Sequence, residues 1–175
     1  MSIHPTQPTT EHVTVRLMLE EFQYGRARLT EIHADQAIPS GHVSVRFYRS
    51  ALIDSVVSKF LLYGNGWIEK ALAGFGVDAE IAAVRAALAQ PLGKSTLGEV
   101  LKDSRNKLIS HGVELDIAEH IRRHENATGL SNEELARLVP EAIEVLFDRV
   151  EELAHGMDRV AAVALAGRQP GSPNP

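Results

Sequence analysis

The chain contains no cysteine, which excludes disulfides, thiolate metal ligands and a cysteine nucleophile. Aromatic residues are scarce at 5%, while the hydrophobic fraction of 44% and charged fraction of 23% are those of an ordinary globular protein. Long hydrophobic runs are also missing. The longest, residues 160–167, is far shorter than the roughly 20 residues that span a bilayer. The composition predicts a globular protein without a membrane-spanning helix.

Positive charge is in deficit as well. The net charge of −5 argues against an extended electrostatic surface for DNA, although it leaves room for a local basic cleft. The first residues lack the basic-then-apolar pattern of a secretory signal, and the absence of cysteine fits a reducing compartment. We therefore expect a cytoplasmic protein. The length of 175 residues suits a single domain with a hydrophobic core.

The two ends of the chain differ in composition from its centre. Residues 1–10 contain two prolines and three threonines and are predicted to form a flexible arm. Residues 167–175 are rich in proline and glycine and are predicted to be a disordered tail. Residues 11–166 carry helical periodicity and are predicted to form a single helical domain.

The first half of this domain predicts two long helices. One covers residues 11–37 and ends before Pro39, and the second covers residues 42–63. The first helix repeats apolar residues or glycine every three or four positions, the spacing of a single face: Val15, Met18, Phe22, Gly25, Leu29 and Ile32. The second has a wider apolar face, which is typical of a helix packed inside a bundle.

Glycines separate the next elements. Gly64 and Gly66 end the second helix, and a short helix at 67–73 is ended by Gly74 and Gly76. No strand precedes these glycines, so they do not indicate a phosphate-binding loop.

Three shorter helices are predicted next. Asp78 is the expected N-cap of a helix that runs to about residue 90. Ser95 is expected to start the following helix, and Gly112 to end it. A less regular helix is predicted for residues 116–125.

The last part of the domain begins with a capping box. Ser131 and Glu134 have its spacing and predict one further turn of helix. Pro140 is then expected in the first turn of a new helix, residues 140–166, rather than inside one. The predicted buried face of this helix is Ala142, Val145, Leu146, Val150, Leu153, Met157, Val160 and Ala164. The predicted architecture is all-α: a helical bundle with long antiparallel N- and C-terminal helices and shorter helices between them.

The stretch from Arg105 to His111, followed by Gly112, is the strongest candidate for function. On a helical wheel Arg105 and His111 flank an apolar stripe, while Asn106 points to the polar side. The stripe consists of Leu97, Val100, Leu101, Ser104 and Leu108. If the stripe met its copy in a second chain, two arginines and two histidines would converge at the two-fold axis.

Such a cleft suits phosphodiester chemistry without a metal ion. The guanidinium of Arg105 can bind phosphate oxygens and the charge of the transition state. The imidazole of His111 titrates near neutrality and can exchange a proton with a ribose hydroxyl or a leaving oxygen. A purely structural interpretation also fits, since cations in a last helical turn and a glycine beyond it terminate a helix well.

Arg105-Asn106 followed by His111 resembles the R-x(4–6)-H signature of the HEPN superfamily, and the form Arg-Asn-Lys-Leu-Ile-Ser-His resembles its abortive-infection branch. The resemblance implies a helical bundle with a composite active site at a homodimer interface and metal-independent cleavage of RNA. It also implies a role in toxin–antitoxin pairs or phage defence, with an antitoxin or regulatory partner. Val113 stands where many antitoxin-paired members have tyrosine, so inactivation by modification of that tyrosine is not expected.

The resemblance assigns roles by position. His111 would be the general acid or base, Arg105 the phosphate clamp and Asn106 a supporting polar group, with no cofactor and no metal. The alternative is a non-catalytic helical module that recruits a protein or nucleic-acid partner through its apolar stripe.

For the other candidate site residues, structural interpretations are favoured over functional ones. His120 and His124 have metal-ligand spacing, but Ile121 stands where a zincin motif needs glutamate, and Arg122 and Arg123 between the histidines would oppose a cation, so a solvated charged helix is favoured there. Glu152 and His155 match half of a di-iron motif whose second half is missing. Four arginines of the first two helices could line an RNA cleft, although solvated side chains are the favoured interpretation: Arg26, Arg28, Arg46 and Arg49. Tyr48 and Trp67 could stack on bases, although packing in the core or an interface is favoured for both.

Overall fold

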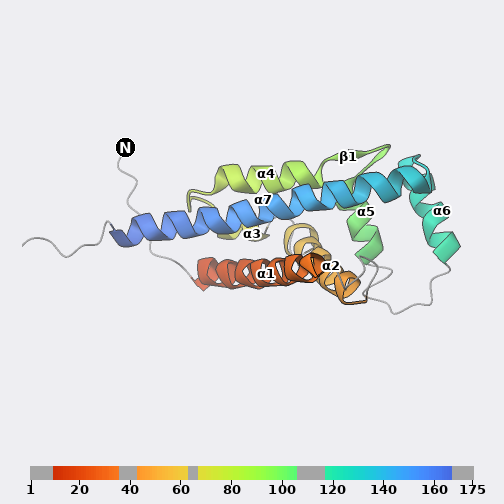
Figure 1. Cartoon of the computed structure of the whole chain (residues 1–175). Coiled ribbons are helices and arrows are strands. Elements are labelled where there is room, and N and C mark those ends of the chain that lie inside the picture. Colours follow the sequence, from red (N-terminus) through yellow and green to blue (C-terminus); the bar gives the residue numbers. More distant parts are fainter. Residues whose placement is uncertain (1–9, 36–42, 63–66, 106–116, 167–175) are drawn as a thin grey trace, which may run out of the picture.

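The computed structural model describes residues 10–35, 43–62, 67–105 and 117–166. Within these ranges the chain is an all-α helical bundle with one short hairpin, which confirms the predicted fold class (Figure 1). No helix in the described part of the chain is both long enough and apolar enough to cross a bilayer. The predicted arm and tail lie outside the described residues, apart from Thr10, which begins the first helix.

The first two helices pack against each other. Helix α1 spans Thr10–Ala34 and packs against α2, which spans Val43–Val56. Directly after α2 the backbone widens into a π-helix, η1, at Val57–Leu62. The second predicted helix is therefore present, but its last turns are not α-helical. Such π-helical turns often occur at functional sites.

Glycines shape the next connection. Helix α3 spans Trp67–Ala71, and Gly74 and Gly76 after it have φ of 74° and 94°. Their prediction as helix terminators is confirmed. Helix α4 spans Asp78–Leu88, but the expected capping role of Asp78 is wrong. Val77 occupies the N-cap position without a side-chain hydrogen bond. Asp78 is the first helical residue, where its negative charge interacts favourably with the helix dipole.

A two-stranded ribbon follows α4 and was not predicted. Strands β1 (Pro91–Leu92) and β2 (Ser95–Thr96) pair antiparallel around a tight turn at Gly93. The backbone N–H of Lys94 in this turn donates to Thr128 O at 2.7 Å. Strands of two residues are too short to show alternation, so periodicity could not reveal them.

Three helices follow the hairpin in the described part of the chain. Helix α5 spans Leu97–Ser104, α6 spans Ile117–Thr128, and Gly129, with φ of 71°, precedes α7 at Asn132–Ala166. The predicted break at Pro140 is wrong, because this proline lies inside the continuous α7. Proline removes the bond to the carbonyl of Ala136, but Ala136 is exposed and water can replace the missing donor.

Helix α7 is the spine of the bundle. It runs antiparallel to α1 along the length of the molecule, and α4 lies along its other side (Figure 1). Most of its predicted face is buried, but Val145 is 42% exposed. The predicted face did not include three further buried residues of α7. Helices α1 and α4 both cover α7, so its buried side is wider than one stripe and also contains Ile143, Phe147 and Ala154.

Gly93 is predicted to be essential to the junction of hairpin and α6. A Cβ at this position would lie 2.0 Å from Thr128 O, in a backbone with φ of 62°. Gly93→Ala should therefore lower the free energy of unfolding by more than about 3 kcal/mol. Gly74→Ala is the matched control, since φ is 74° there and nothing lies within 4 Å. It should cost about 1–2 kcal/mol. Urea unfolding followed by circular dichroism measures both, and equal losses would contradict the prediction.

Candidate functional site

Of the three predicted site residues, Arg105 alone belongs to the described part of the chain. Asn106 and His111 lie outside the described residues, as does Gly112. Arg105 follows the last residue of α5 in right-handed helical conformation, with φ of −59° and ψ of −49°. The structure therefore defines where the Arg105 end of the motif lies.

A capping box starts α5. Thr96 Oγ1 accepts from the N–H of Glu99, and the Glu99 carboxylate accepts from the N–H of Thr96. Hydrogen bonds from Ser95 and Thr96 lower the pKa of Glu99 below its usual range. The cap is therefore Thr96, not Ser95 as expected, although the Ser95 hydroxyl also bonds Glu99 at 2.8 Å. This cap sets the rotation of the helix that carries Arg105.

The described part of the motif's apolar stripe is used within the chain. Leu97, Val100 and Leu101 are buried, and α5 contacts η1, α4 and α7. These side chains are therefore not available to meet a second copy of the helix. A dimer that unites two motifs needs another surface.

The guanidinium of Arg105 is tied to α2. Its Nε donates to Asp54 Oδ1 at 2.8 Å, and both side chains are partly buried, with 25% of Arg105 and 36% of Asp54 exposed. The hydroxyl of Ser58 approaches the same carboxylate oxygen at 3.4 Å. Asp54 stands in the last turn of α2, directly before the π-helix. The ion pair thus fixes the arginine without burying it completely.

The π-helix supplies a second cation on the other side of this turn. Lys59 Nζ donates to Ser55 Oγ at 2.7 Å and to the backbone oxygen of Met18 at 3.2 Å. The carboxylate of Glu21 lies 3.9 Å away. Burial lowers the pKa of Lys59 from its usual 10.5, while the negative charges of Glu21 and Asp54 oppose this shift. Lys59 therefore joins the π-turn to α1.

A histidine approaches the same end of α5 from α6. The Nε2 of His124 lies 3.3 Å from Ser104 Oγ, next to Arg105 in the chain, and His124 is only 9% exposed. The expectation of a solvated helix at this position is therefore wrong. The side chain of His120 is outside the described set, and no group of three metal-ligating side chains occurs in the described ranges. His124 acts as a contact between α5 and α6.

The N-terminal arginines are engaged with α7. Arg26 lies within salt-bridge distance of Glu144, Asp148 and Glu151, and its guanidinium lies 5.7 Å from the ring centre of Phe147. One of these carboxylates, Glu144, also holds Arg49, whose Nη2 lies 3.0 Å from it. Arg26 is only 16% exposed, so it is not a solvated arginine.

Two further arginines complete this group. Arg28 pairs with Glu31 on its own helix, and the Arg46 side chain lies outside the described set. The described members of the group therefore hold the bundle together or pair locally.

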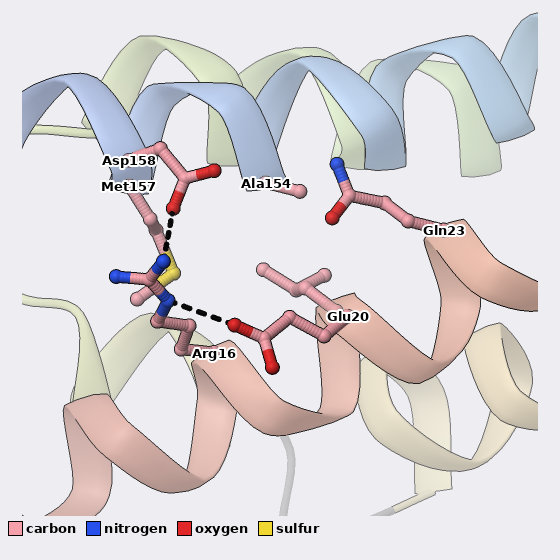
Figure 2. A pocket seen from close by; sticks show the side chains of 7 residues that line it. Arg16, Glu20, Gln23, Ala154, Met157 and Asp158 are labelled. Atoms are coloured by element: carbon pink, nitrogen blue, oxygen red, sulfur yellow. Dashed lines mark hydrogen bonds and ion pairs between the residues drawn. The ribbon is translucent and has the colours of Figure 1, made fainter.

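The remaining candidates have structural roles. Tyr48 and Trp67 are half-buried and pack on the core, as the default interpretation expected. Glu152 pairs with Arg149, and His155 is exposed. A hollow of about 10 Å³ lies between α1 and α7, where Arg16 bridges Glu20 and Asp158 at 3.0 Å each (Figure 2). It has room for about one water, so it is a structural tie rather than a ligand site.

Comparison with known proteins adds no assignment: no protein-family model, no curated protein and no solved structure matches this chain.

The residues that sequence reasoning missed are Asp54, Lys59 and the Ser104–His124 contact. A signal for the first two exists, because four polar residues interrupt the apolar second helix at helical spacing: Asp54, Ser55, Ser58 and Lys59. Polar groups on the inner side of a helix need partners, and these partners come from α1 and α5. Which element would supply them depends on the tertiary fold.

The ion pair of Arg105 predicts a stability effect at Asp54. Asp54→Asn keeps the shape of the side chain but removes the charge opposite a partly buried guanidinium, and should lower the free energy of unfolding by about 1–2 kcal/mol. Glu152→Gln is the matched control, because it breaks the exposed Arg149–Glu152 pair and should cost less than about 0.5 kcal/mol. Chemical denaturation tests both variants. A cost at Asp54 no larger than at Glu152 would show that the pair does not hold α5 to α2.

Lys59 predicts a dependence of stability on alkaline pH. Between its lowered pKa and 10.5 the unfolded chain binds more protons than the folded chain, so this lysine makes stability rise with pH. Lys59→Met should remove that part of the rise, measured by urea unfolding at several alkaline pH values. Lys70→Met removes the same charge at an exposed position and should retain the wild-type slope. A wild-type slope in Lys59→Met would refute the prediction.

Proposed function

We propose that the chain is a HEPN-like, metal-independent endoribonuclease of toxin–antitoxin or phage-defence systems that acts as a homodimer. Arg105 clamps the phosphate, His111 transfers the proton, and Asn106 supports them. The observation that carries the proposal is the fixation of Arg105: α5 is capped at one end, buried along its stripe, and joined to Asp54 at the other end. Preorganised donors of this kind are what transition-state stabilisation requires.

The partial exposure of Arg105 supports the same proposal. A quarter of this side chain is open to solvent, so a phosphate can approach the guanidinium. Asp54 holds the guanidinium through Nε, and this geometry orients the planar fork. The dimer interface that the proposal requires lies outside the buried stripe of α5.

Cleavage of labelled RNA in EDTA tests the proposal. Arg105→Ala should reduce the rate about 10²–10³-fold and His111→Ala about 10²–10⁴-fold, because each removes a group that acts in the transition state. Arg159→Ala and His155→Ala are matched controls at exposed positions and should cut like the wild type. If both site variants retain the wild-type rate, the assigned site is wrong. A stable monomer in solution would refute the composite dimer.

A second candidate function is a non-catalytic helical module. The observation that favours it is an exposed apolar line on α1, where Val13, Leu17 and Tyr24 are 50%, 56% and 67% exposed. Their spacing puts them on one face of the helix. This face, and not the α5 stripe, would recruit a partner protein. Wild-type protein that is folded, dimeric and inert toward all RNAs tested would favour this function.

A further inference from the structure

An open pocket of about 230 Å³ lies between α1 and α2. Its walls are mainly apolar and come from both helices: Phe22, Gly25, Tyr48, Ala51 and Leu52. Gly25 allows the close approach of the helices, since a Cβ there would lie 3.0 Å from Leu52 Cδ2. The volume is smaller than the roughly 300–1,000 Å³ of pockets for drug-sized ligands, so it suits a single ring system.

One end of the pocket is polar. Glu21 and Ser55 line it, and both lie near the ammonium of Lys59, with Ser55 Oγ at 2.7 Å and Glu21 Oε2 at 3.9 Å. An ammonium group can only donate, so the Ser55 oxygen accepts and its hydrogen is directed elsewhere. The pocket thus has a hydroxyl donor and a carboxylate acceptor at one end of apolar walls that include an aromatic ring. A flat ligand with a donor and an acceptor on one edge matches this arrangement.

The pocket and the candidate site adjoin at two consecutive residues of α2. Ser55 lines the pocket, and the preceding residue, Asp54, binds Arg105. We propose that this pocket receives a single unpaired nucleobase of the RNA, an inference that rests on the proposed ribonuclease function. The base packs against Tyr48 and the aliphatic walls, and its edge bonds Ser55 and Glu21. The neighbouring phosphate then lies on the side of Arg105.

Binding without cleavage tests this inference. The full-length His111→Ala chain is titrated with AMP, CMP, GMP and UMP, and with ribose 5-phosphate, by calorimetry. At least one nucleotide should bind at least 10-fold more tightly than ribose 5-phosphate, a difference of about 1.4 kcal/mol that stacking of the base can supply. Equal affinities for ribose 5-phosphate and all four nucleotides would mean that no base is recognised and would overturn the proposal.

A pair of neighbouring variants locates the site. Ala51→Phe in the same His111→Ala background fills the pocket from an exposed position and should weaken nucleotide binding at least 10-fold. Ser50→Phe adds the same ring at the adjacent exposed position, which does not line the pocket, and should change affinity less than 2-fold. Circular dichroism confirms that both variants fold. Equal effects of the two substitutions would overturn the proposal.

The inference and the ribonuclease proposal fail separately. If Ala51→Phe in the otherwise wild-type chain cuts RNA with unchanged KM and kcat, the pocket is not a base site while the ribonuclease function stands. If nucleotides bind the pocket with the expected selectivity but the wild type cuts no RNA, the pocket stands and the cleavage function fails.

Discussion

Burial of one wide face of α7 is the interaction on which the bundle depends. Helices α1 and α4 cover this face from two sides, and its fully buried side chains include Leu146, Phe147 and Leu153. Three apolar side chains of this size contribute several kcal/mol of burial, which exceeds the cost of about 3 kcal/mol for a proline inside a helix. Packing therefore explains why Pro140 lies within α7 instead of starting a new helix.

The edge of this buried face of α7 also organises charge. Its carboxylates at Glu144, Asp148 and Glu151 surround Arg26, so α1 is held by an ion-pair cluster beside an apolar contact. The Arg26 guanidinium stands near the Phe147 ring, where cation–π attraction adds to the ion pairs. Arg26 and Arg49, which the sequence offers as candidates for RNA binding, thus stabilise the packing of α1 and α2 against α7.

The all-α fold and several helix ends could be predicted from the sequence because they depend on local chemistry. The capping box of Ser131 and Glu134 is confirmed by the hydrogen bond from the Ser131 N–H to the Glu134 carboxylate at 2.8 Å. Gly74 and Gly76 ended a helix as expected because their positive φ suits residues without a side chain. Details that depend on tertiary contacts were not predictable. The sequence does not show that Leu97 and Val100 face the chain's own core rather than a second copy.

In the candidate site, too, some features follow from the local sequence and others depend on tertiary contacts. The position of Arg105 beside the apolar stripe follows from spacing, whereas Asp54 is 51 residues away in sequence and meets Arg105 only in the folded chain. The π-helix at Val57–Leu62 could not be predicted either, since no residue pattern distinguishes residues 57–62 from an α-helix.

The charge distribution limits how an RNA could be held. Most arginines with described contacts already have carboxylate partners in the bundle, and the whole chain carries a net charge of −5. Affinity from phosphate contacts grows with the number of cations that face the backbone, so arginines already paired with carboxylates contribute less to it. The proposed ribonuclease would therefore rely on unpaired bases and on a small number of oriented phosphate contacts. The apolar pocket beside Ser55 and the fixed guanidinium of Arg105 are the described features that meet these two requirements.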